Sequence, residues 1–283
     1  MTDVAIIGSG PAGLSAAVNA RARGASAVVY GRDPATSALY RAPALLNHLG
    51  AGGRPGGELL REYIAEAEAA GVAFERGRVS QIITGGVSFG IIMGSEFFQA
   101  KTVVIASGGG AAKTVPGEER FVGKGVSYCA TCDGALYRGR DVAIVAETDE
   151  AREDAELLAR MCRRVYYVDK IGKGLPGERS NVEFVPGDVS GVSGGEYVEK
   201  VEVGSSQIAV DAVFFIRPVV PVSGFIFGLA VDPSGAIAVG RSMETSIPGV
   251  FACGDAAGKP YQLSKAIGEG LVAGQSAARY NSV

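Results

Sequence analysis

The chain has 283 residues, of which 47% are hydrophobic and 20% charged, so it is long enough for two ordinary domains and is not mainly disordered. Its formal net charge of −3 excludes bulk electrostatic binding to nucleic acid. Glycine contributes 42 residues without a Gly-X-Y period, which excludes collagen and indicates many tight turns and close backbone contacts.

The first apolar stretch, Val4–Ile7, is too short for a secretory signal, and no run of about 18 apolar residues is present to span a membrane. Four cysteines in so long a chain do not make a disulfide scaffold either. We therefore expect a cytoplasmic protein with no membrane contact and no nucleic-acid partner.

The N-terminal residues predict a strand–helix–strand unit. Residues 4–7 form a short buried strand, residues 14–23 a helix and residues 27–30 a second strand. Gly24 follows the helix at the position of a C-terminal cap. Residues 101–106 (KTVVIA) predict a further buried strand.

A second unit of the same kind begins with a strand over residues 142–145, followed by a helix over 148–164 and a strand over 165–168. A β-rich stretch with regular turn signals continues to residues 214–216. The last predicted element is a helix over about 264–280. The pattern is that of two α/β units.

The motif Gly8-x-Gly10-x-x-Gly13 lies between the first strand and the first helix. In that context it predicts a dinucleotide-binding loop, in which the glycines permit the turn and the approach of a pyrophosphate to the helix N-terminus. A tight turn without a ligand is the alternative. Which dinucleotide binds stays open at this point, because Gly31-Arg32 replaces the acid that normally ends the second strand.

Cys129 and Cys132 are separated by two residues and are followed by Asp133. Two thiols at this spacing can close a small disulfide and reopen it, and a thiolate can attack a partner disulfide. Asp133 is placed to move protons. A zinc site would need two further ligands from distant residues, and an inert reduced pair is the third alternative. We interpret the pair as redox-active, with no metal.

Residues 125–134 (GVSYCATCDG) resemble the active-site segment of the low-molecular-weight thioredoxin reductases. Residues 245–255 resemble the second FAD motif of that family, and Gln262 with residues 266–270 resembles the segment that covers the flavin ring. Asn47 falls where the family has an asparagine near the flavin. The resemblance covers nearly the whole chain.

The resemblance implies an α/β fold with two Rossmann-like, three-layer ββα dinucleotide-binding domains, the second inserted in the first. The FAD-binding domain would comprise residues 1–113 and 217–283. A degenerate pyridine-nucleotide-type domain over residues 114–216 would carry the cysteines. FAD is the implied cofactor, a thioredoxin-like protein the implied partner and a homodimer the implied assembly.

The resemblance also implies residue roles. Cys132 would face the flavin, Cys129 would attack thioredoxin, and Asp133 would be the acid and base. Asp255 would bond the ribityl chain and Gln262 would approach the flavin. The implied FAD-binding residues are Gly8, Gly10, Pro11, Ala12, Gly13, Gly31, Arg32, Asn47, Ala106, Gly254, Asp255, Gln262 and Leu263.

The chain departs from the family at the second glycine loop, which is replaced by residues 146–151 (AETDEA). Ala146 carries a Cβ atom where a backbone must approach phosphate, and Glu147 adds a carboxylate whose repulsion at about 5 Å amounts to roughly 3 kcal/mol. Asp169-Lys170 replaces the arginine pair that follows the next strand. We expect no productive NADPH site, and a well-capped helix at this acidic run.

A different donor must then reduce the flavin. Some relatives without NADPH motifs use reduced ferredoxin, which is our leading candidate, and others use a reduced deazaflavin. The alternatives are a dithiol oxidase that passes electrons to oxygen, an NAD(P)H- or deazaflavin-dependent thioredoxin reductase, and a non-enzymatic FAD-bound scaffold or sensor. Arginines at residues 138, 140, 160, 163 and 164 could dock an acidic ferredoxin, although a solvated surface is the simpler interpretation. Cys162 and Cys253 are expected to be buried and inert.

Overall fold

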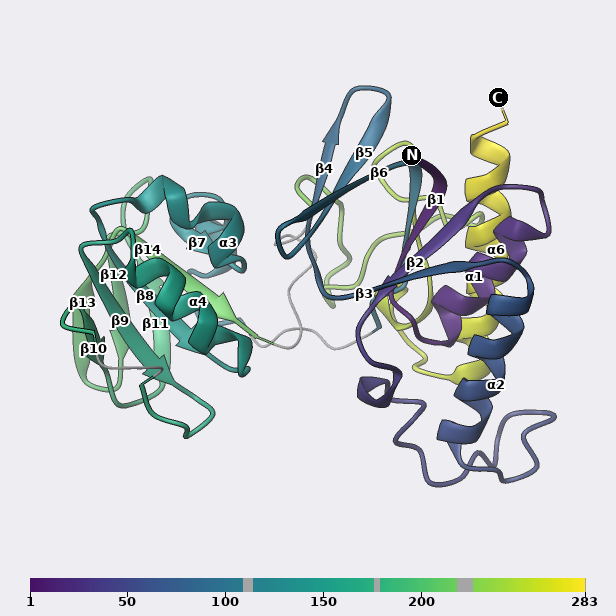
Figure 1. The fold of residues 1–283 in the computed structure, drawn as a ribbon, viewed down its shortest axis with the longest axis horizontal. Helices are drawn as coiled ribbons and strands as arrows, with labels where there is room; N and C mark the ends of the chain where they lie inside the picture. The colour runs from purple at the N-terminus through teal and green to yellow at the C-terminus, as the bar shows by residue number, and fades with distance from the viewer. Residues whose placement is uncertain (109–113, 176–178, 218–225, 283) are drawn as a thin grey trace. The chain divides into compact units, whose positions relative to one another are not determined.

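The computed structural model describes residues 1–108, 114–175, 179–217 and 226–282. The chain divides into two compact units: unit 1 comprises Met1–Ala111 and Ile226–Val283, and unit 2 comprises Ala112–Phe225. Unit 2 is therefore an insertion in unit 1, and each unit has its own sheet and helices (Figure 1). This α/β architecture confirms the predicted fold class. Within the described residues, no helix combines the length and the apolar character needed to span a bilayer.

The two crossings between the units differ in how closely they match the sequence-based boundaries. The first crossing, at residues 111 and 112, lies next to the expected boundary after residue 113. The second lies later than the expected boundary after residue 216, at residues 225 and 226. Ile226 forms a bridge to Ile82 of unit 1, so the chain has returned to unit 1 at that residue.

A seven-stranded sheet forms the centre of unit 1. Its strands are β1 (Thr2–Ile7), β2 (Ala27–Gly31), β3 (Ala73–Arg76), β4 (Val79–Gly85), β5 (Ser88–Met93), β6 (Glu96–Ile105) and β15 (Val250–Ala252). The C-terminal half of β6 pairs in parallel with β1 and β15, and its N-terminal half pairs antiparallel with β5. The parallel strands continue through β2 to β3, and the antiparallel part ends at β4.

Three helices pack with this sheet around one apolar core. They are α1 (Pro11–Arg21), α2 (Gly56–Ala69) and α6 (Leu263–Tyr280). Helix α1 begins before the predicted residue 14, because the fixed φ of Pro11 suits the first turn of a helix. Helices α1 and α6 touch without intervening side chains, since a Cβ at Gly270 or Gly274 would fall 2.2 or 2.1 Å from a carbonyl oxygen of α1.

Unit 2 is built around a five-stranded parallel sheet. In spatial order its strands are β10 (Val182–Phe184), β9 (Arg164–Asp169), β8 (Asp141–Ala146), β14 (Ala212–Ile216) and β7 (Val126–Ser127). Helix α4 (Glu150–Ala159) and the short helix α3 (Ala130–Asp133) contribute side chains to the core on one face of this sheet. On the other face lies an antiparallel sheet of β11 (Val189–Ser193), β12 (Lys200–Val203) and β13 (Ser206–Ala209). Short connecting helices are η2 (Glu119–Phe121), α3 (Ala130–Asp133) and η3 (Gly134–Tyr137).

Helix α4 is shorter than the helix predicted over residues 148–164. Asn181 donates from Nδ2 to the carbonyl oxygens of Ala159 and Cys162, at 2.9 and 3.2 Å, and so satisfies carbonyls at the helix end. Arg164 already belongs to β9. The periodic pattern could not show where the helix stops, because Asn181 lies far along the chain.

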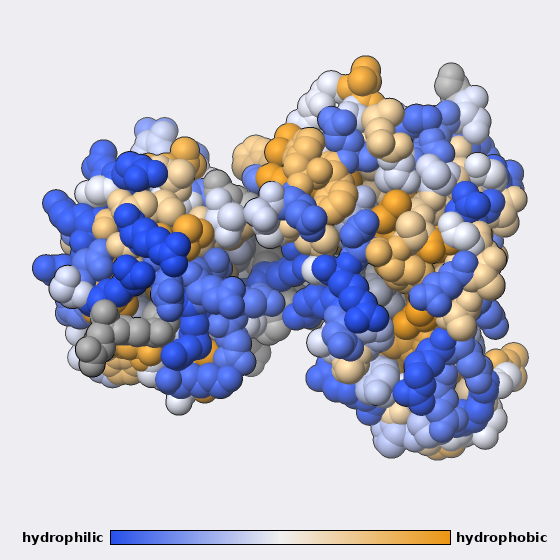
Figure 2. All heavy atoms as spheres, viewed as in Figure 1, coloured by the Kyte–Doolittle hydropathy of each residue, from blue (hydrophilic) through white to orange (hydrophobic). Residues whose placement is uncertain are grey.

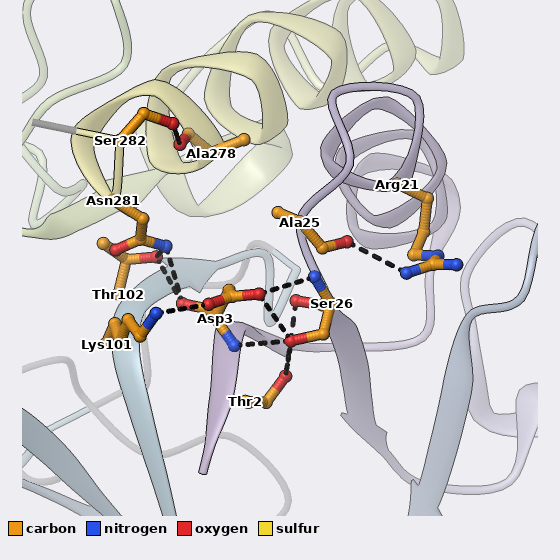
Figure 3. A network of polar contacts seen from close by, with 10 residues as sticks. All are labelled: Thr2, Asp3, Arg21, Ala25, Ser26, Lys101, Thr102, Ala278, Asn281 and Ser282. Carbon is orange, nitrogen blue, oxygen red and sulfur yellow. Dashed lines mark hydrogen bonds and ion pairs between the residues drawn. The ribbon is translucent and has the colours of Figure 1, made fainter.

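Asp3 binds the start of β1 to the segment before β2, to β6 and to the C-terminal end of α6 (Figure 3). Its carboxylate accepts hydrogen bonds from the backbone N–H and the hydroxyl of Ser26, both at 2.8 Å, and lies 2.7 Å from Lys101 Nζ. Its carbonyl oxygen accepts from Asn281 Nδ2 at 2.8 Å and from Thr102 Oγ1 at 2.9 Å. The hydrogen bond with Lys101, followed by those with Ser26, lowers the pKa of Asp3 to about 2.

We predict that Asp3→Asn lowers the free energy of unfolding at pH 7 by about 1–2 kcal/mol, because charge-assisted hydrogen bonds at a partly exposed site are lost. A carboxyl whose pKa falls on folding stabilises the protein above its unfolded pKa, about 3.9, and loses this contribution as the pH falls towards 2. The difference from wild type in urea unfolding should therefore shrink below about pH 4. Glu96→Gln, at the exposed start of β6, is the control. A difference that stays constant with pH would contradict this assignment.

Candidate functional site

The predicted FAD-binding residues of unit 1 meet at the C-terminal ends of parallel strands. β1, β6 and β15 run side by side, and the loops after them carry the glycine motif, Ala106 and Gly254. A Cβ at Gly8 would lie 2.2 Å from the carbonyl oxygen of Ala106. A Cβ at Gly254 would lie 2.7 Å from the Cβ of Ala12. The three loops are therefore in direct contact, at the edge of the sheet where open α/β sheets bind ligands.

The three glycines of the motif have different surroundings. Gly8 has a φ of +121°, which other residues rarely adopt, and a Cβ at Gly13 would lie 1.9 Å from the carbonyl oxygen of Gly8. Gly10 has no atom within 4 Å of its Cβ position. Gly10 is also the N-cap of α1, and Pro11 is the first helical residue. The open space at Gly10, next to a helix N-terminus, fits the pyrophosphate of FAD.

The missing acid at the end of β2 has a steric cause. A Cβ at Gly31 would lie 2.5 Å from Ser9 Oγ and 2.9 Å from Ser9 N. The hydroxyl of Ser9 donates to the carbonyl oxygen of Arg32 at 3.1 Å, which holds this end of β2 against the glycine loop. A glutamate at this position would require the glycine loop to move, so glycine is part of this version of the site.

The loop that carries Asn47 is tied to the start of α6. Asn47 Nδ2 donates to Gln262 Oε1 at 2.7 Å, and His48 Nδ1 lies 3.0 Å from Ser264 Oγ. Gln262 is the N-cap of α6 and Leu263 is its first residue. The structure thus brings Asn47, Gln262 and Leu263 together from segments about 215 residues apart.

Asp255 lies in the short helix η4 (Gly254–Ala257), and its burial raises the pKa of its carboxyl group. The neighbouring turn is held by Lys265, whose Nζ donates to the carbonyl oxygens of Gly254 and Gly258 at 2.8 and 2.7 Å. Lys265 also pairs with Glu269 at 2.9 Å, and Glu269 accepts from the N–H of Gly254. Our sequence analysis did not single out this pair, although the i,i+4 spacing of its charges was a signal.

The redox segment of unit 2 runs from β7 through α3. Cys129 is disulfide-bonded, and the side chain of Cys132 lies outside the described residues. The hydroxyl of the buried Ser127 donates to Asp133 Oδ2 at 2.7 Å and accepts from the N–H of Cys129 at 3.1 Å. Ser127 therefore holds the Asp133 carboxylate beside Cys129. The sequence analysis did not identify Ser127. The only signal for it was its position two residues before Cys129.

Cys162 and Cys253 are free and buried, as expected. Burial raises the pKa of the Cys162 thiol to about 11 and that of the Cys253 thiol to about 12. Neither forms an appreciable thiolate at neutral pH, so both fit the role of packing residues.

Residues 146–151 begin at the last residue of β8, at the C-terminal edge of the sheet of unit 2, where nucleotide-binding domains hold the pyrophosphate. Glu147 Oε1 lies 3.1 Å from Arg217 Nη2. The N–H of Glu147 donates to the carbonyl oxygen of Ile216 at 2.9 Å, so this loop is tied to the end of β14. An ion pair within the protein thus lies at the position where a phosphate-binding glycine loop would stand.

The turn after β9 is also engaged with the protein itself. Lys170 forms an ion pair with Asp188. The Asp169 carboxylate accepts hydrogen bonds at 2.6–3.0 Å from the backbone N–H groups of Ile171, Gly172 and Gly174. Both residues that replace the arginine pair are therefore bound within unit 2.

The start of α4 does not have the side-chain cap that the acidic run suggested. Asp149 is the N-cap residue but makes no capping hydrogen bond, and its carboxylate lies 2.7 Å from Lys173 Nζ. Arg152 donates to the carbonyl oxygens of Lys173, Gly174 and Leu175 at 2.8–3.2 Å. These contacts hold the turn after β9 against the first turn of α4. The Asp149 carboxylate binds Lys173 in this turn instead of capping the helix.

Glu147 opposes a bound phosphate less strongly than its charge alone suggests. Treated as a lone carboxylate, it would repel a phosphate by roughly 3 kcal/mol. Arg217 neutralises it, so the repulsion is weaker than that. What opposes a nucleotide is instead that Glu147 and Arg217 bind one another and that the turn after β9 is bound to the first turn of α4.

The arginines between residues 138 and 164 do not form an unopposed basic patch. Figure 2 shows a largely hydrophilic face of unit 2. Among the described residues, the ion pairs there are Arg140–Asp211, Arg160–Glu156, Arg163–Asp141 and Arg164–Glu183. Four of the five arginines of the predicted patch are thus paired with acids, which favours the solvated-surface interpretation for these four.

We predict that Gly10→Ala weakens FAD binding at least about tenfold and leaves the fold intact, because the new methyl group enters space that no protein atom fills. Titration of the flavin-free protein with FAD, followed by flavin fluorescence, gives the affinity. Gly85→Ala, also in open space but on β4, is the matched control and should bind FAD as wild type does. Unchanged affinity in Gly10→Ala would contradict a pyrophosphate at this loop.

Comparisons with known proteins agree with this geometry. Residues 2–270 match the pyridine nucleotide-disulphide oxidoreductase family. The chain is 31% identical to a thioredoxin reductase of Listeria monocytogenes, over 98% of this chain and 93% of that protein. It is 34% identical to a thioredoxin reductase of Aquifex aeolicus, over 89% of this chain and 84% of that protein.

Among solved structures, a ferredoxin-flavin thioredoxin reductase from Clostridium acetobutylicum is 39% identical with a TM-score of 0.85, covering 98% of this chain and 97% of that one. A thioredoxin reductase from Gloeobacter violaceus is 29% identical with a TM-score of 0.73, covering 99% of this chain and 93% of that one. The chain therefore belongs to the pyridine nucleotide-disulphide oxidoreductases, as an FAD-dependent disulfide oxidoreductase of the thioredoxin reductase type.

Proposed function

We propose that this protein passes electrons from reduced ferredoxin, through FAD and a disulfide between Cys129 and Cys132, to thioredoxin or a thioredoxin-like protein. The observation that carries the choice of donor is the ion pair of Glu147 with Arg217, which lies where NADPH would need a phosphate-binding loop. The similarity to a protein described as a ferredoxin-flavin thioredoxin reductase supports the same donor.

The energetics suit this direction of electron flow. A plant-type ferredoxin has a potential near −400 mV and thioredoxin one near −270 mV. The gap of about 130 mV corresponds to roughly 6 kcal/mol for two electrons, so the transfer is downhill. FAD, when bound, supplies a carrier that accepts electrons one at a time and delivers them as a pair.

We assign FAD to the cradle at Gly8, Gly10 and Gly13, with Asp255 and Gln262 nearer the flavin end. The proposed binding set also includes Pro11, Ala12, Gly31, Arg32, Asn47, Ala106, Gly254 and Leu263.

In unit 2, two electrons and two protons convert the disulfide to two thiols. Cys132 is the thiol on the flavin side. The Cys129 thiolate then attacks the disulfide of thioredoxin and forms a mixed disulfide, and the Cys132 thiolate displaces reduced thioredoxin and restores the original bond. Asp133, held by Ser127 at 2.7 Å, is placed to give and take the proton at these sulfur atoms.

We infer that the protein works as a cytoplasmic homodimer, the location and assembly that the family resemblance implies. A mass measured by light scattering during size-exclusion chromatography tests the assembly. A monomer at micromolar concentration would remove the dimer from the proposal and leave the electron path unchanged.

We predict that reduced ferredoxin bleaches the flavin absorbance of the oxidised protein under anaerobic conditions and that NADPH and NADH at about 100 µM do not, since the loop over residues 146–151 binds within the protein. The same assay is run in parallel with reduced deazaflavin, with dithiols and oxygen, and with buffer alone. Rapid bleaching by NADPH would contradict the proposal. Peroxide formation from dithiols, without a response to ferredoxin, would favour the dithiol oxidase.

We predict that Cys129→Ser lowers thioredoxin reduction by more than about a hundredfold and leaves FAD bound, because the attacking sulfur is lost and the cofactor loops lie in unit 1. Insulin reduction coupled to thioredoxin measures the activity, and absorbance measures the flavin. Cys162→Ser removes a buried thiol from the same unit and should keep full activity. Retained activity in Cys129→Ser would refute the assignment.

A further inference from the structure

Unit 2 buries a pair of opposite charges that the proposed electron path does not use. Glu118 is 0% exposed and Arg217 is 3% exposed, and Arg217 Nη1 lies 2.9 Å from Glu118 Oε1. Taking such groups out of water costs several kcal/mol each, and their mutual attraction often only balances that cost. A buried pair is therefore weak evidence of a stabilising role, and its connections to the rest of unit 2 are more informative.

The Glu118 carboxylate receives three hydrogen bonds. Oε1 accepts from Arg217 and, at 2.8 Å, from the hydroxyl of Tyr128. Oε2 accepts from the backbone N–H of Val115 at 2.9 Å. Burial raises the pKa of Tyr128, and the charge of Glu118 raises it further, so the hydroxyl stays protonated and continues to donate. We call Val115, Glu118, Tyr128 and Arg217 the Glu118 cluster.

The members of the Glu118 cluster come from parts of the chain that matter for the reaction. Val115 lies just after the first crossing into unit 2, and Arg217 is the last described residue before the second crossing. Tyr128 directly precedes Cys129. One carboxylate thus joins the segments by which the chain enters and leaves unit 2 to the segment that carries the redox cysteine.

We propose that Glu118 and Tyr128 are positioning residues for the redox disulfide: the bond from the Tyr128 hydroxyl to Glu118 holds the backbone before Cys129 in the conformation that favours the closed disulfide. The inference rests on the proposed redox use of Cys129. No electron or proton passes through the Glu118 cluster. Its effect is on the equilibrium between disulfide and dithiol, because a backbone already ordered lowers the entropy that ring closure must remove.

The sign of the effect follows from this argument. When the hydroxyl of Tyr128 is removed, closing the disulfide must also order the segment before Cys129. The equilibrium then shifts from the disulfide towards the dithiol. We expect Tyr128→Phe to favour the dithiol by about tenfold, which corresponds to about 30 mV for a two-electron couple. Glu118 retains Arg217 and the N–H of Val115 in this variant, so unit 2 should still fold.

The test uses the FAD-loaded protein, equilibrated anaerobically in mixtures of reduced and oxidised dithiothreitol. Maleimide labelling and mass spectrometry count the free thiols at each ratio. The matched control is Tyr167→Phe, which removes the hydroxyl of a fully buried tyrosine from the same unit without touching Glu118. Because dithiothreitol replaces the physiological donor, the result does not depend on whether ferredoxin or a nicotinamide reduces the flavin.

A shift of threefold or more towards the dithiol in Tyr128→Phe, absent from Tyr167→Phe, supports the proposal. A smaller shift, a shift towards the disulfide, or an equal shift in both variants overturns it. Arg217→Lys gives a second measure, since lysine keeps the charge but lacks the planar fork that reaches Glu118 and Glu147 together. It should shift the equilibrium in the same direction as Tyr128→Phe, and an unchanged equilibrium would count against the Glu118 cluster.

Discussion

A guanidinium that is almost completely buried must find its acceptors inside the protein, and this requirement shapes the C-terminal edge of the sheet in unit 2. Arg217 pairs with Glu118, in the segment by which the chain enters unit 2, and with Glu147, in the loop after β8. With Glu147 bound in this way, the loop over residues 146–151 closes onto the end of β14. The same edge of a parallel sheet is the usual place for a nucleotide. Arg217 therefore connects the loop at that edge, through Glu118 and Tyr128, to the segment before Cys129.

Unit 1 is organised by a different constraint, the contact of backbone with backbone where a Cβ has no room. Gly13 against Gly8, and Gly270 and Gly274 against α1, allow the first and last helices to approach the same sheet edge. As a result, loops from distant parts of the sequence meet at this edge of the sheet, and no atom lies within 4 Å of the Cβ position of Gly10. The two units therefore differ: glycines leave room beside the N-terminus of α1 in unit 1, whereas paired charges occupy the corresponding edge of unit 2.

The parts of this arrangement that depend on short stretches of sequence were predictable. The glycine motif and the Cys129 segment carry their information within about ten residues, and the α/β fold followed from the periodic pattern and the resemblance. The Glu118–Arg217 pair was not predictable, because its partners are 99 residues apart and each looks like an ordinary surface charge. The end of α4 depends on the distant Asn181 in the same way. At Gly31 the sequence showed that the acid was missing, but only the position of Ser9 showed why.

The hydrogen bonds around Asp169 limit what a substitution at Glu147 alone can change at this edge of unit 2. Three N–H groups of the turn after β9 converge on one carboxylate, and Arg152 binds the carbonyl side of the same turn. A substitution at Glu147 alone would leave this turn in place and would leave Arg217 paired with Glu118. Making room for a nucleotide at this edge therefore requires changes in the loop after β8, in the turn after β9 and at the first turn of α4 together.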